Sequence, residues 1–261
     1  MHCRNCNDKL NDIFLDLGKC PPSNSLLKNN NEKKKERKFE LITYVCKKCW
    51  LVQTKDVVNK KNFFNNRYPY FSSTSSSWVQ HAKTYVNKIC RNLKINEKKL
   101  VVEIASNDGY LLQFFKEKKI PCLGIEPSTN TSRLAKKKGI KSIDKFFSYN
   151  LAKKIKNKAD LIIGNNVYAH VPNLNDFTKG MKTLLKDNGT ITLEFPHLLN
   201  LIKFSQFDTI YHEHFSYFSL HSISKILKKF NLIIFKVEKI NTHGGSLRIY
   251  IKNKISKKIK I

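Results

Sequence analysis

From about residue 100 onward, short apolar runs alternate with longer segments whose apolar positions recur at helical spacing. The apolar runs predict strands near residues 100–105, 122–126, 140–143, 160–164, 190–195 and 232–238. The amphipathic segments predict helices near residues 109–119, 129–138, 148–156, 174–186 and 221–229. A late segment, 245–252, alternates like a further strand at the edge of the sheet. This rhythm predicts an α/β domain with a mostly parallel sheet covered by helices on both faces.

The pattern is weaker before this domain. Residues 1–60 hold too few apolar positions for a core of their own. A connector follows and leads into a helix over Trp78–Leu93, with Ser76 or Ser77 as its N-cap. We therefore expect four parts: a small N-terminal domain at 1–60, a connector and capping helix at 61–98, a core at 99–251, and a Lys-rich tail at 252–261.

The chain is strongly basic, with a net charge of +29 at pH 7. Basic faces bind nucleic acids by neutralising phosphates. Only six of the 49 basic residues are arginine, however, and the lysines are spread over every predicted helix face. Since arginine is the residue favoured for bidentate recognition of phosphates and bases, we expect no nucleic-acid partner. The charge would still attract an anionic small substrate.

No membrane or export segment is predicted. No run approaches the roughly 18 to 20 apolar residues that a membrane span requires, and Met1–Cys6 lacks the apolar centre of a signal peptide. We therefore expect a cytoplasmic protein without membrane association.

Two pairs of cysteines have the spacing of metal ligands. Cys3 and Cys6 form one Cys-x2-Cys pair, and Cys46 and Cys49 form another. In a reducing compartment such pairs favour a tetrahedral Zn²⁺ site over disulfides, with separate unmetallated thiols as the alternative. The gap between the pairs contains a charged insertion, Lys28–Lys38, that can loop out. The other cysteines are expected only to pack: Cys20, Cys90 and Cys122.

The strand predicted at 100–105 ends in small and turn-forming residues, as a nucleotide-binding turn does. The turn runs from Ala105 to Gly109, and a second acid, Glu126, follows the next strand, where it would accept from both ribose hydroxyls of an adenosine-like ligand. Ala105 and Asn107 stand where a dinucleotide site would have glycines. With no pyrophosphate to cradle, S-adenosylmethionine fits better than NAD. The alternative is an ordinary junction between a strand and a helix.

Polar side chains also follow later strands. Asn165, Asn166 and His170 come after the strand at 160–164. The ligand edge of such a sheet lies at the carboxyl ends of its strands, so these side chains are expected to face a ligand.

The densest polar cluster lies at 206–215. It contains Tyr211, His212, Glu213 and His214. A carboxylate between two imidazoles, with a phenol nearby, can hold and tune a general base. A surface turn with incidental histidines and a His-x-His metal pair are the alternatives.

Near the end of the chain, two glycines stand beside a predicted strand. They belong to Thr242–Arg248, which also contains His243. Gly244 and Gly245 permit either a close approach of backbone to a ligand or a tight hairpin, and the sequence favours neither.

These motifs together resemble one family. They are the two cysteine pairs and the segments 68–73, 103–112, 124–127, 166–171, 207–214 and 242–248. In this order they are similar to the zinc-containing, S-adenosylmethionine-dependent nucleotide-sugar C-methyltransferases, and the resemblance covers nearly the whole chain. It implies a zinc-binding N-terminal domain and a class I (Rossmann-like) methyltransferase core that methylates C-3 of a nucleotide-linked 4-keto-deoxysugar.

The resemblance also implies roles for individual residues. His214 would remove the proton alpha to the sugar ketone, Tyr211 and Glu213 would orient sugar and base, and His170 would line the same pocket. Further substrate contacts are implied for Tyr68, Tyr70, His243 and Arg248. Cofactor contacts are implied for Glu103, Ala105, Asn107, Asp108, Gly109, Glu126, Asn165 and Asn166.

One departure concerns the end of the chain. Members of that family usually continue into a second Rossmann-like domain that helps to hold the nucleotide diphosphate, whereas this chain stops shortly after Arg248. A separately encoded C-terminal domain, a truncated gene and a genuine short form remain alternatives. Other functions also remain open: a methyltransferase of another small acceptor, a remnant that binds cofactor without turnover, and a zinc module that binds nucleic acid.

Overall fold

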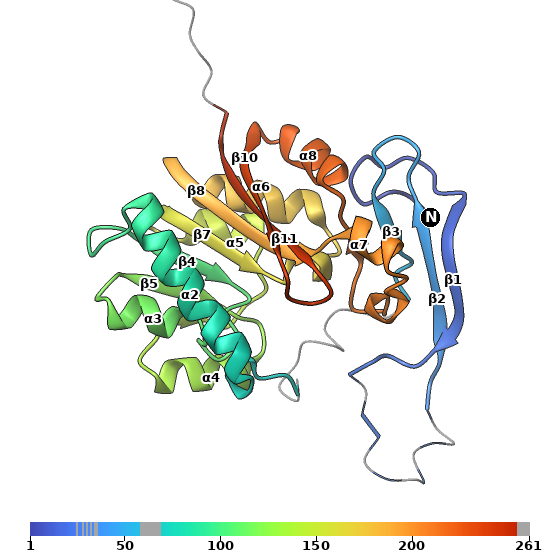
Figure 1. The fold of residues 1–261 in the computed structure, drawn as a ribbon, viewed down its shortest axis with the longest axis horizontal. Coiled ribbons are helices and arrows are strands. Elements are labelled where there is room, and N and C mark those ends of the chain that lie inside the picture. The colour runs from blue at the N-terminus through green and yellow to red at the C-terminus, as the bar shows by residue number, and fades with distance from the viewer. Residues whose placement is uncertain are drawn as a thin grey trace, which may run out of the picture.

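The computed structural model describes residues 1–24, 26–27, 29, 31, 33, 36–57 and 69–254, and in these residues the chain forms two sheets. The larger has seven strands in the order β10-β11-β8-β7-β4-β5-β6 (Figure 1). In that order they span Leu232–Ile240, Ser246–Asn253, Leu185–Pro196, Ala159–Asn165, Val101–Ile104, Cys122–Ile125 and Ser142–Ile143. The five strands β8, β7, β4, β5 and β6 are parallel to one another. Strand β11 pairs antiparallel with both β8 and β10. The predicted alternation is confirmed, and the sheet is mixed because its last two strands form a hairpin.

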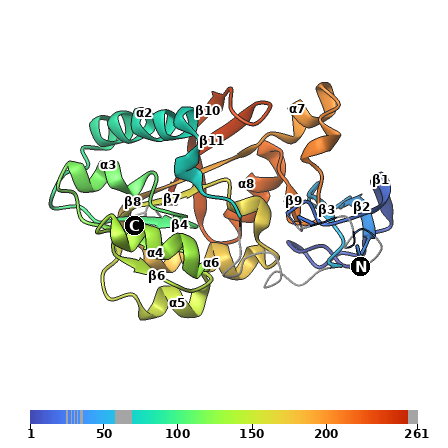
Figure 2. The same cartoon turned by 90° about the horizontal axis from the view of Figure 1, so that it is seen from below.

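Helices cover both faces of this sheet, as predicted (Figures 1 and 2). On one face, Val101, Leu161 and Ile163 pack with α2 (Ser76–Leu93) and α3 (Leu112–Glu117). On the other, Val102 and Ile162 belong to a second core with residues of α5 (Tyr149–Lys154), α6 (Leu174–Leu184) and α8 (Leu220–Lys228). Alternate strand residues therefore enter opposite cores, as the period of two along a strand requires. A further helix, α4, spans Thr129–Lys137.

Several element boundaries differ from the prediction. Helix α3 begins at Leu112 rather than near residue 109, because the residues before it form the turn after β4. Helix α2 begins at Ser76, and its N-cap is Ser75, whose hydroxyl oxygen accepts from the backbone N–H of Trp78 at 3.3 Å. The prediction of Ser76 or Ser77 as the cap was therefore wrong by one residue.

The smaller sheet consists of three strands of the N-terminal region and one strand of the core. Its order is β1-β2-β3-β9, with antiparallel pairs throughout. The strands span Asp12–Cys20, Phe39–Val45, Val52–Thr54 and, from the core, Ser216–Tyr217. Leu41 and Val52 pack with Leu198 and Leu201 of α7 (Leu198–Lys203), so this sheet shares its apolar cluster with the core. Figure 1 shows α7 beside β3.

Some predictions fall outside the described residues. They are part of the Lys28–Lys38 insertion, residues 58–68 of the connector including Tyr68, and residues 255–261 of the tail. No helix of the described ranges is long and apolar enough to cross a membrane.

Candidate active site and metal centre

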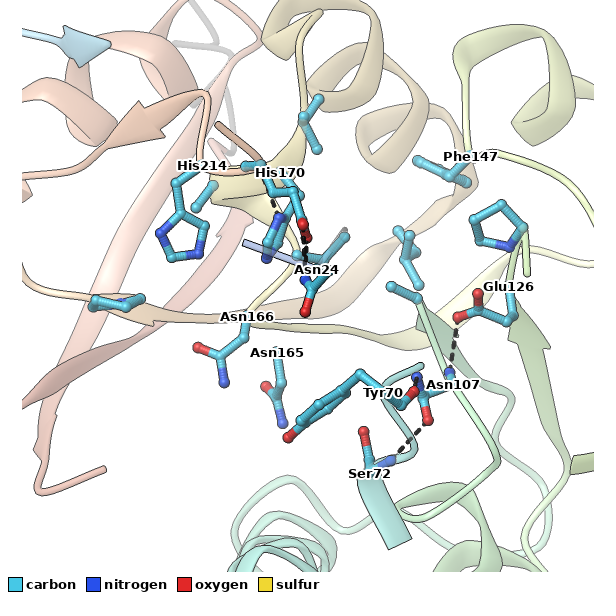
Figure 3. Close-up of a pocket in the computed structure, with 18 of the residues that line it drawn as sticks. Asn24, Tyr70, Ser72, Asn107, Glu126, Phe147, Asn165, Asn166, His170 and His214 are labelled. Carbon is cyan, nitrogen blue, oxygen red and sulfur yellow. Dashed lines mark hydrogen bonds between the residues drawn. The ribbon is translucent and has the colours of Figure 1, made fainter. Parts of the chain in front are cut away.

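A cavity of about 520 Å³ opens at the carboxyl ends of the parallel strands. Its walls include Ala105 after β4, Glu126 after β5, Asn166 after β7 and Pro196 at the end of β8. This is the edge at which open α/β sheets bind ligands, and the volume lies within the roughly 300 to 1,000 Å³ of small-molecule sites. In Figure 3, His170 and His214 lie toward one end of the cavity and Glu126 toward the other.

The turn after β4 is left-handed at three positions. Ala105 has a φ of 59°, Asn107 of 50° and Gly109 of 77°. A Cβ added to Gly109 would lie 2.4 Å from Cδ1 of Ile140, so a side chain at this position would displace that methyl group. A left-handed alanine is strained, and such strain concentrates at functional sites. Ala105 and Asn107 line the cavity.

Glu126 joins this turn to the end of β5. Its Oε2 accepts from the backbone N–H of Asn107 at 2.9 Å, and its Oε1 accepts from the backbone N–H of Ser128 at 2.8 Å. Burial raises the pKa of Glu126, while these two hydrogen bonds act in the opposite direction. Glu126 also lines the cavity, where its carboxylate can accept from a ligand hydroxyl.

The turn also holds the segment that precedes α2. Oδ1 of Asn107 accepts from the backbone N–H of Ser72 at 2.9 Å, and its Nδ2 donates to the carbonyl of Tyr70 at 3.1 Å (Figure 3). Asp108 accepts from the hydroxyl and the backbone N–H of Ser73. These bonds place Tyr70 in the cavity wall.

Three of the predicted cofactor residues lie in or next to the turn but do not line the cavity. Glu103, Asp108 and Gly109 are buried, and none of them is among the residues that line the cavity. Burial raises the pKa of Glu103 well above its usual value, and the charges of Glu126 and Asp108 act in the same direction.

Two amides lie at the end of β7 and line the cavity. Among the described residues, neither side-chain polar atom of Asn165 has a hydrogen-bond partner, and Oδ1 of Asn166 also has none. Asn166 is held in a left-handed conformation with a φ of 50°. Since buried polar atoms are almost always paired in proteins, these amides are suited to a polar ligand.

His214 has a defined tautomer. Its Nδ1 lies 2.9 Å from the carbonyl of Thr209, which can only accept, so Nδ1 carries the proton. Its Nε2 is then the acceptor and lies 2.8 Å from the hydroxyl of Tyr211. Burial lowers the pKa of His214 well below its usual value, and the nearby His170 acts in the same direction. The imidazole is therefore neutral at pH 7, with its basic nitrogen facing a phenol that lines the cavity.

His170 and Glu213 complete this end of the site. The ring of His170 lies 4.6 Å from that of His214, and its Nδ1 donates to the carbonyl of Glu213 at 2.8 Å. Burial lowers the pKa of His170 to about 4, although this hydrogen bond acts to raise it. The carboxylate of Glu213 accepts from Nδ2 of Asn24 at 2.7 and 2.8 Å, and burial raises its pKa. Asn24 was not predicted as a site residue, because it precedes a Lys- and Asn-rich stretch that shows no motif.

The neighbouring His212 is not part of this cluster. Its Nε2 lies 3.3 Å from the carbonyl of Phe39 on β2, and it does not line the cavity. The alternative of a His-x-His metal pair is therefore not supported.

The hairpin between β10 and β11 brings His243 into the cavity wall, against Trp78 at a ring distance of 5.0 Å. The adjoining glycines are both left-handed, and a Cβ added to Gly245 would lie 2.1 Å from Nδ2 of Asn200. These two glycines therefore allow a tight hairpin that packs closely on α7. Arg248 does not line the cavity.

Arg248 is buried in a polar network. It pairs with Glu194 at 2.5 Å and lies 3.0 Å from Nε2 of His81. His81 stacks on Trp78 at a ring distance of 4.8 Å, so the network supports a residue of the cavity wall. The buried charges act on each other: burial opposes ionisation of Glu194, but His81 and Arg248 lower its pKa overall.

The four paired cysteines come together in the N-terminal region. All four Sγ atoms lie within 4.8 Å of one another, with 3.5 Å between Cys3 and Cys49 and between Cys6 and Cys46. Tetrahedral zinc with bonds of about 2.3 Å would hold sulfurs about 3.8 Å apart. The residues therefore fit a Zn²⁺ ion.

The two cysteine pairs have the same backbone turn. Asn7 donates to the carbonyl of Cys3 at 2.9 Å, and Trp50 donates to the carbonyl of Cys46 at 2.7 Å. Both donors are left-handed, with φ of 60° and 61°. The two knuckles thus have the same turn, although neither has glycine at this position.

The strand order and the ligand edge define a class I (Rossmann-like) methyltransferase fold. The PH0226 protein from Pyrococcus horikoshii OT3 is similar over 71% of this chain and 95% of its own, with a TM-score of 0.56 and 16% identity. Magnesium protoporphyrin IX methyltransferase from Synechocystis PCC 6803, solved with bound SAH, is similar over 67% of this chain and 83% of its own, with a TM-score of 0.54 and 15% identity.

Two family models match the sequence. Residues 3–64 match a family described as "Putative zinc binding domain", and residues 78–237 match one described as "Methyltransferase domain". The chain therefore belongs to the methyltransferase domain family. It is also 32% identical over 254 residues to the C-methyltransferase NovU from Streptomyces niveus. The match covers 95% of this chain, which spans about 60% of the length of NovU.

Proposed function

We propose that the protein transfers a methyl group from S-adenosylmethionine to a carbon of a nucleotide-linked 4-keto-deoxysugar. The observation that carries this proposal is the neutral, buried His214, whose Nε2 accepts from Tyr211 and which lines the same cavity as Glu126. The similarity to NovU supports transfer to carbon.

The cofactor end of the cavity would be formed by the turn after β4 and by Glu126. In this proposal Glu126 accepts from the ribose hydroxyls, and Ala105 and Asn107 lie against the methionine part. Asn165 and Asn166, with the polar atoms described above, would bind the remaining polar groups. When bound, S-adenosylmethionine supplies an electrophilic methyl group.

At the other end, His214 would act as the base. Its Nε2 takes the proton from the carbon next to the ketone, the C–H bond breaks, and its electron pair enters an enolate of the sugar. The hydroxyl of Tyr211, which donates to Nε2 in this structure, would turn to the keto oxygen and donate to its developing charge. The enolate carbon would then form a bond to the methyl group, while the S–CH3 bond breaks and the sulfur keeps its electron pair, so that the demethylated cofactor leaves as a neutral thioether.

One residue from the N-terminal region and one from the connector would help to enclose the sugar. Asn24 is fixed on the carboxylate of Glu213, and Tyr70 is fixed by Asn107. Both line the cavity between its two ends, and both would exclude water from the enolate.

The test is a methyl-transfer assay with S-adenosylmethionine and a nucleotide-linked 4-keto-6-deoxyhexose. The product is examined by mass spectrometry and by NMR to locate the new methyl group. The assay is run with this chain alone and with any separately encoded C-terminal domain. We expect one methyl group on the carbon next to the ketone. A methyl group on oxygen or nitrogen, or no transfer in either setting, would contradict the proposal.

A further inference from the structure

The backbone of His214 is held by the N-terminal region. Oγ1 of Thr54 on β3 donates to the carbonyl of His214 at 3.0 Å, and the backbone N–H of Thr54 donates to the carbonyl of Phe215 at 3.2 Å. Strand pairing continues beyond these bonds, with Gln53 opposite Ser216. The base therefore lies on a segment that is docked on the small sheet.

The same strand contacts the cysteine cluster. Gln53 is fully buried, and its Nε2 donates to Sγ of Cys3 at 3.3 Å while its Oε1 accepts from the backbone N–H of Arg4 at 2.9 Å. The guanidinium of Arg4 then donates to the carbonyl of Thr54 at 2.6 Å and to that of Phe215 at 3.2 Å. A continuous set of buried and partly buried hydrogen bonds thus joins the thiol cluster to the segment that carries His214.

We infer that Thr54 is a positioning residue for His214, and that Gln53 and Arg4 connect it to the metal-binding cysteines. The inference rests on the proposed role of His214 as the base. In this arrangement the metal centre does more than stabilise the N-terminal region, because it fixes the backbone from which the imidazole projects. Displacement of a catalytic group by about 1 Å is enough to reduce a rate by about a hundredfold.

The chain offers a matched control. Thr43 on β2 lies directly opposite Thr54, is also buried, and donates its hydroxyl to the carbonyl of Leu15 at 3.1 Å. Thr54→Val and Thr43→Val therefore make the same chemical change on neighbouring strands. Only Thr54→Val removes a bond to the catalytic segment, and Thr54→Ser restores that bond.

The experiment measures methyl transfer and amide hydrogen exchange in the full chain. We expect Thr54→Val to reduce kcat by about tenfold or more with little change in KM for S-adenosylmethionine, and to speed exchange at residues 214–217. Thr54→Ser should restore both properties, Thr43→Val should resemble the wild type, and all variants should keep their zinc. Chelation of zinc should speed exchange at residues 214–217 in the wild type.

Hydrogen exchange needs no turnover, so it separates a failure of this inference from a failure of the proposed function. Equal exchange at residues 214–217 in Thr54→Val and Thr43→Val would overturn the inference, even if no substrate were methylated. Unchanged kcat despite faster exchange, no rescue by Thr54→Ser, or unchanged exchange after chelation would also overturn it.

Discussion

The hydroxyl of Tyr211 lies 2.8 Å from Nε2 of His214, and the opposite nitrogen of the same ring donates to the carbonyl of Thr209. Two fixed partners thus set both the tautomer and the direction of the imidazole. The phenol adjoins the basic nitrogen and lines the cavity, where it can move from the base to a substrate oxygen. This relationship connects the fold to the proposed chemistry.

Replacing Tyr211 with Phe should slow methyl transfer while leaving cofactor binding intact. The hydroxyl that would stabilise the enolate oxygen is lost, and removal of one such donor typically lowers kcat by about 10² to 10³. Steady-state kinetics and calorimetry with the demethylated cofactor check both parts. Wild-type kcat in Tyr211→Phe would show that the phenol has no part in the reaction.

Removing Glu126 should weaken the cofactor site. Glu126→Ala removes a charge-assisted contact to the ribose and the acceptor for two backbone N–H groups, so we expect a loss of about 2 to 3 kcal/mol in cofactor binding. Asp160→Ala is the matched control, because Asp160 is a buried acid at the amino end of β7 and does not line the cavity. Equal affinities of the two variants by calorimetry would refute the placement of the ribose.

The metal centre should hold one Zn²⁺ per chain. Replacing both Cys46 and Cys49 with Ser removes half of the ligands and should abolish zinc binding, whereas Cys90→Ser on α2 should not. Elemental analysis of the purified proteins gives the answer. Wild-type protein without zinc, or zinc retained by the double variant, would contradict the site.

Stability should depend on pH through His170. Its pKa is lowered to about 4 in the folded protein, so between pH 4 and 6.5 the unfolded chain binds the extra proton. The free energy of unfolding should therefore be highest above pH 6.5 and fall as the pH is lowered, by up to about 1.4 kcal/mol per pH unit for this proton.

Denaturant unfolding at several pH values checks this dependence. His170→Asn should flatten the fall in unfolding free energy between pH 6.5 and 4. The comparison is with His221→Asn, which removes an exposed imidazole from α8. Equal slopes for the two variants would mean that His170 is not buried in its neutral form.

The sequence predicted the core of the fold because burial there is periodic. Val101 and Val102 face opposite cores, and the apolar runs of the other parallel strands have the same character. The metal site could be predicted equally well, because the coordination geometry of a metal ion restricts the spacing within each cysteine pair. Strands β1 to β3 were missed because much of the apolar packing of their sheet is against α7, far away in the sequence.

Long-range contacts in the site also could not be predicted. Arg248 is separated from Glu194 by 54 residues, and only the pairing of β8 with β11 places them opposite each other. Asn24 meets Glu213 across 189 residues. The left-handed backbone of Ala105 has no sequence signal either, because alanine does not favour it.

We propose that His214 removes the proton next to the sugar ketone. The most direct measurement is the exchange of that proton with solvent deuterium, followed by NMR in wild type and His214→Asn, together with the rate of methyl transfer. We predict that His214→Asn keeps its cofactor affinity, loses the exchange, and methylates about 10² to 10⁴ times more slowly. Exchange and methylation at wild-type rates in His214→Asn would show that another group is the base.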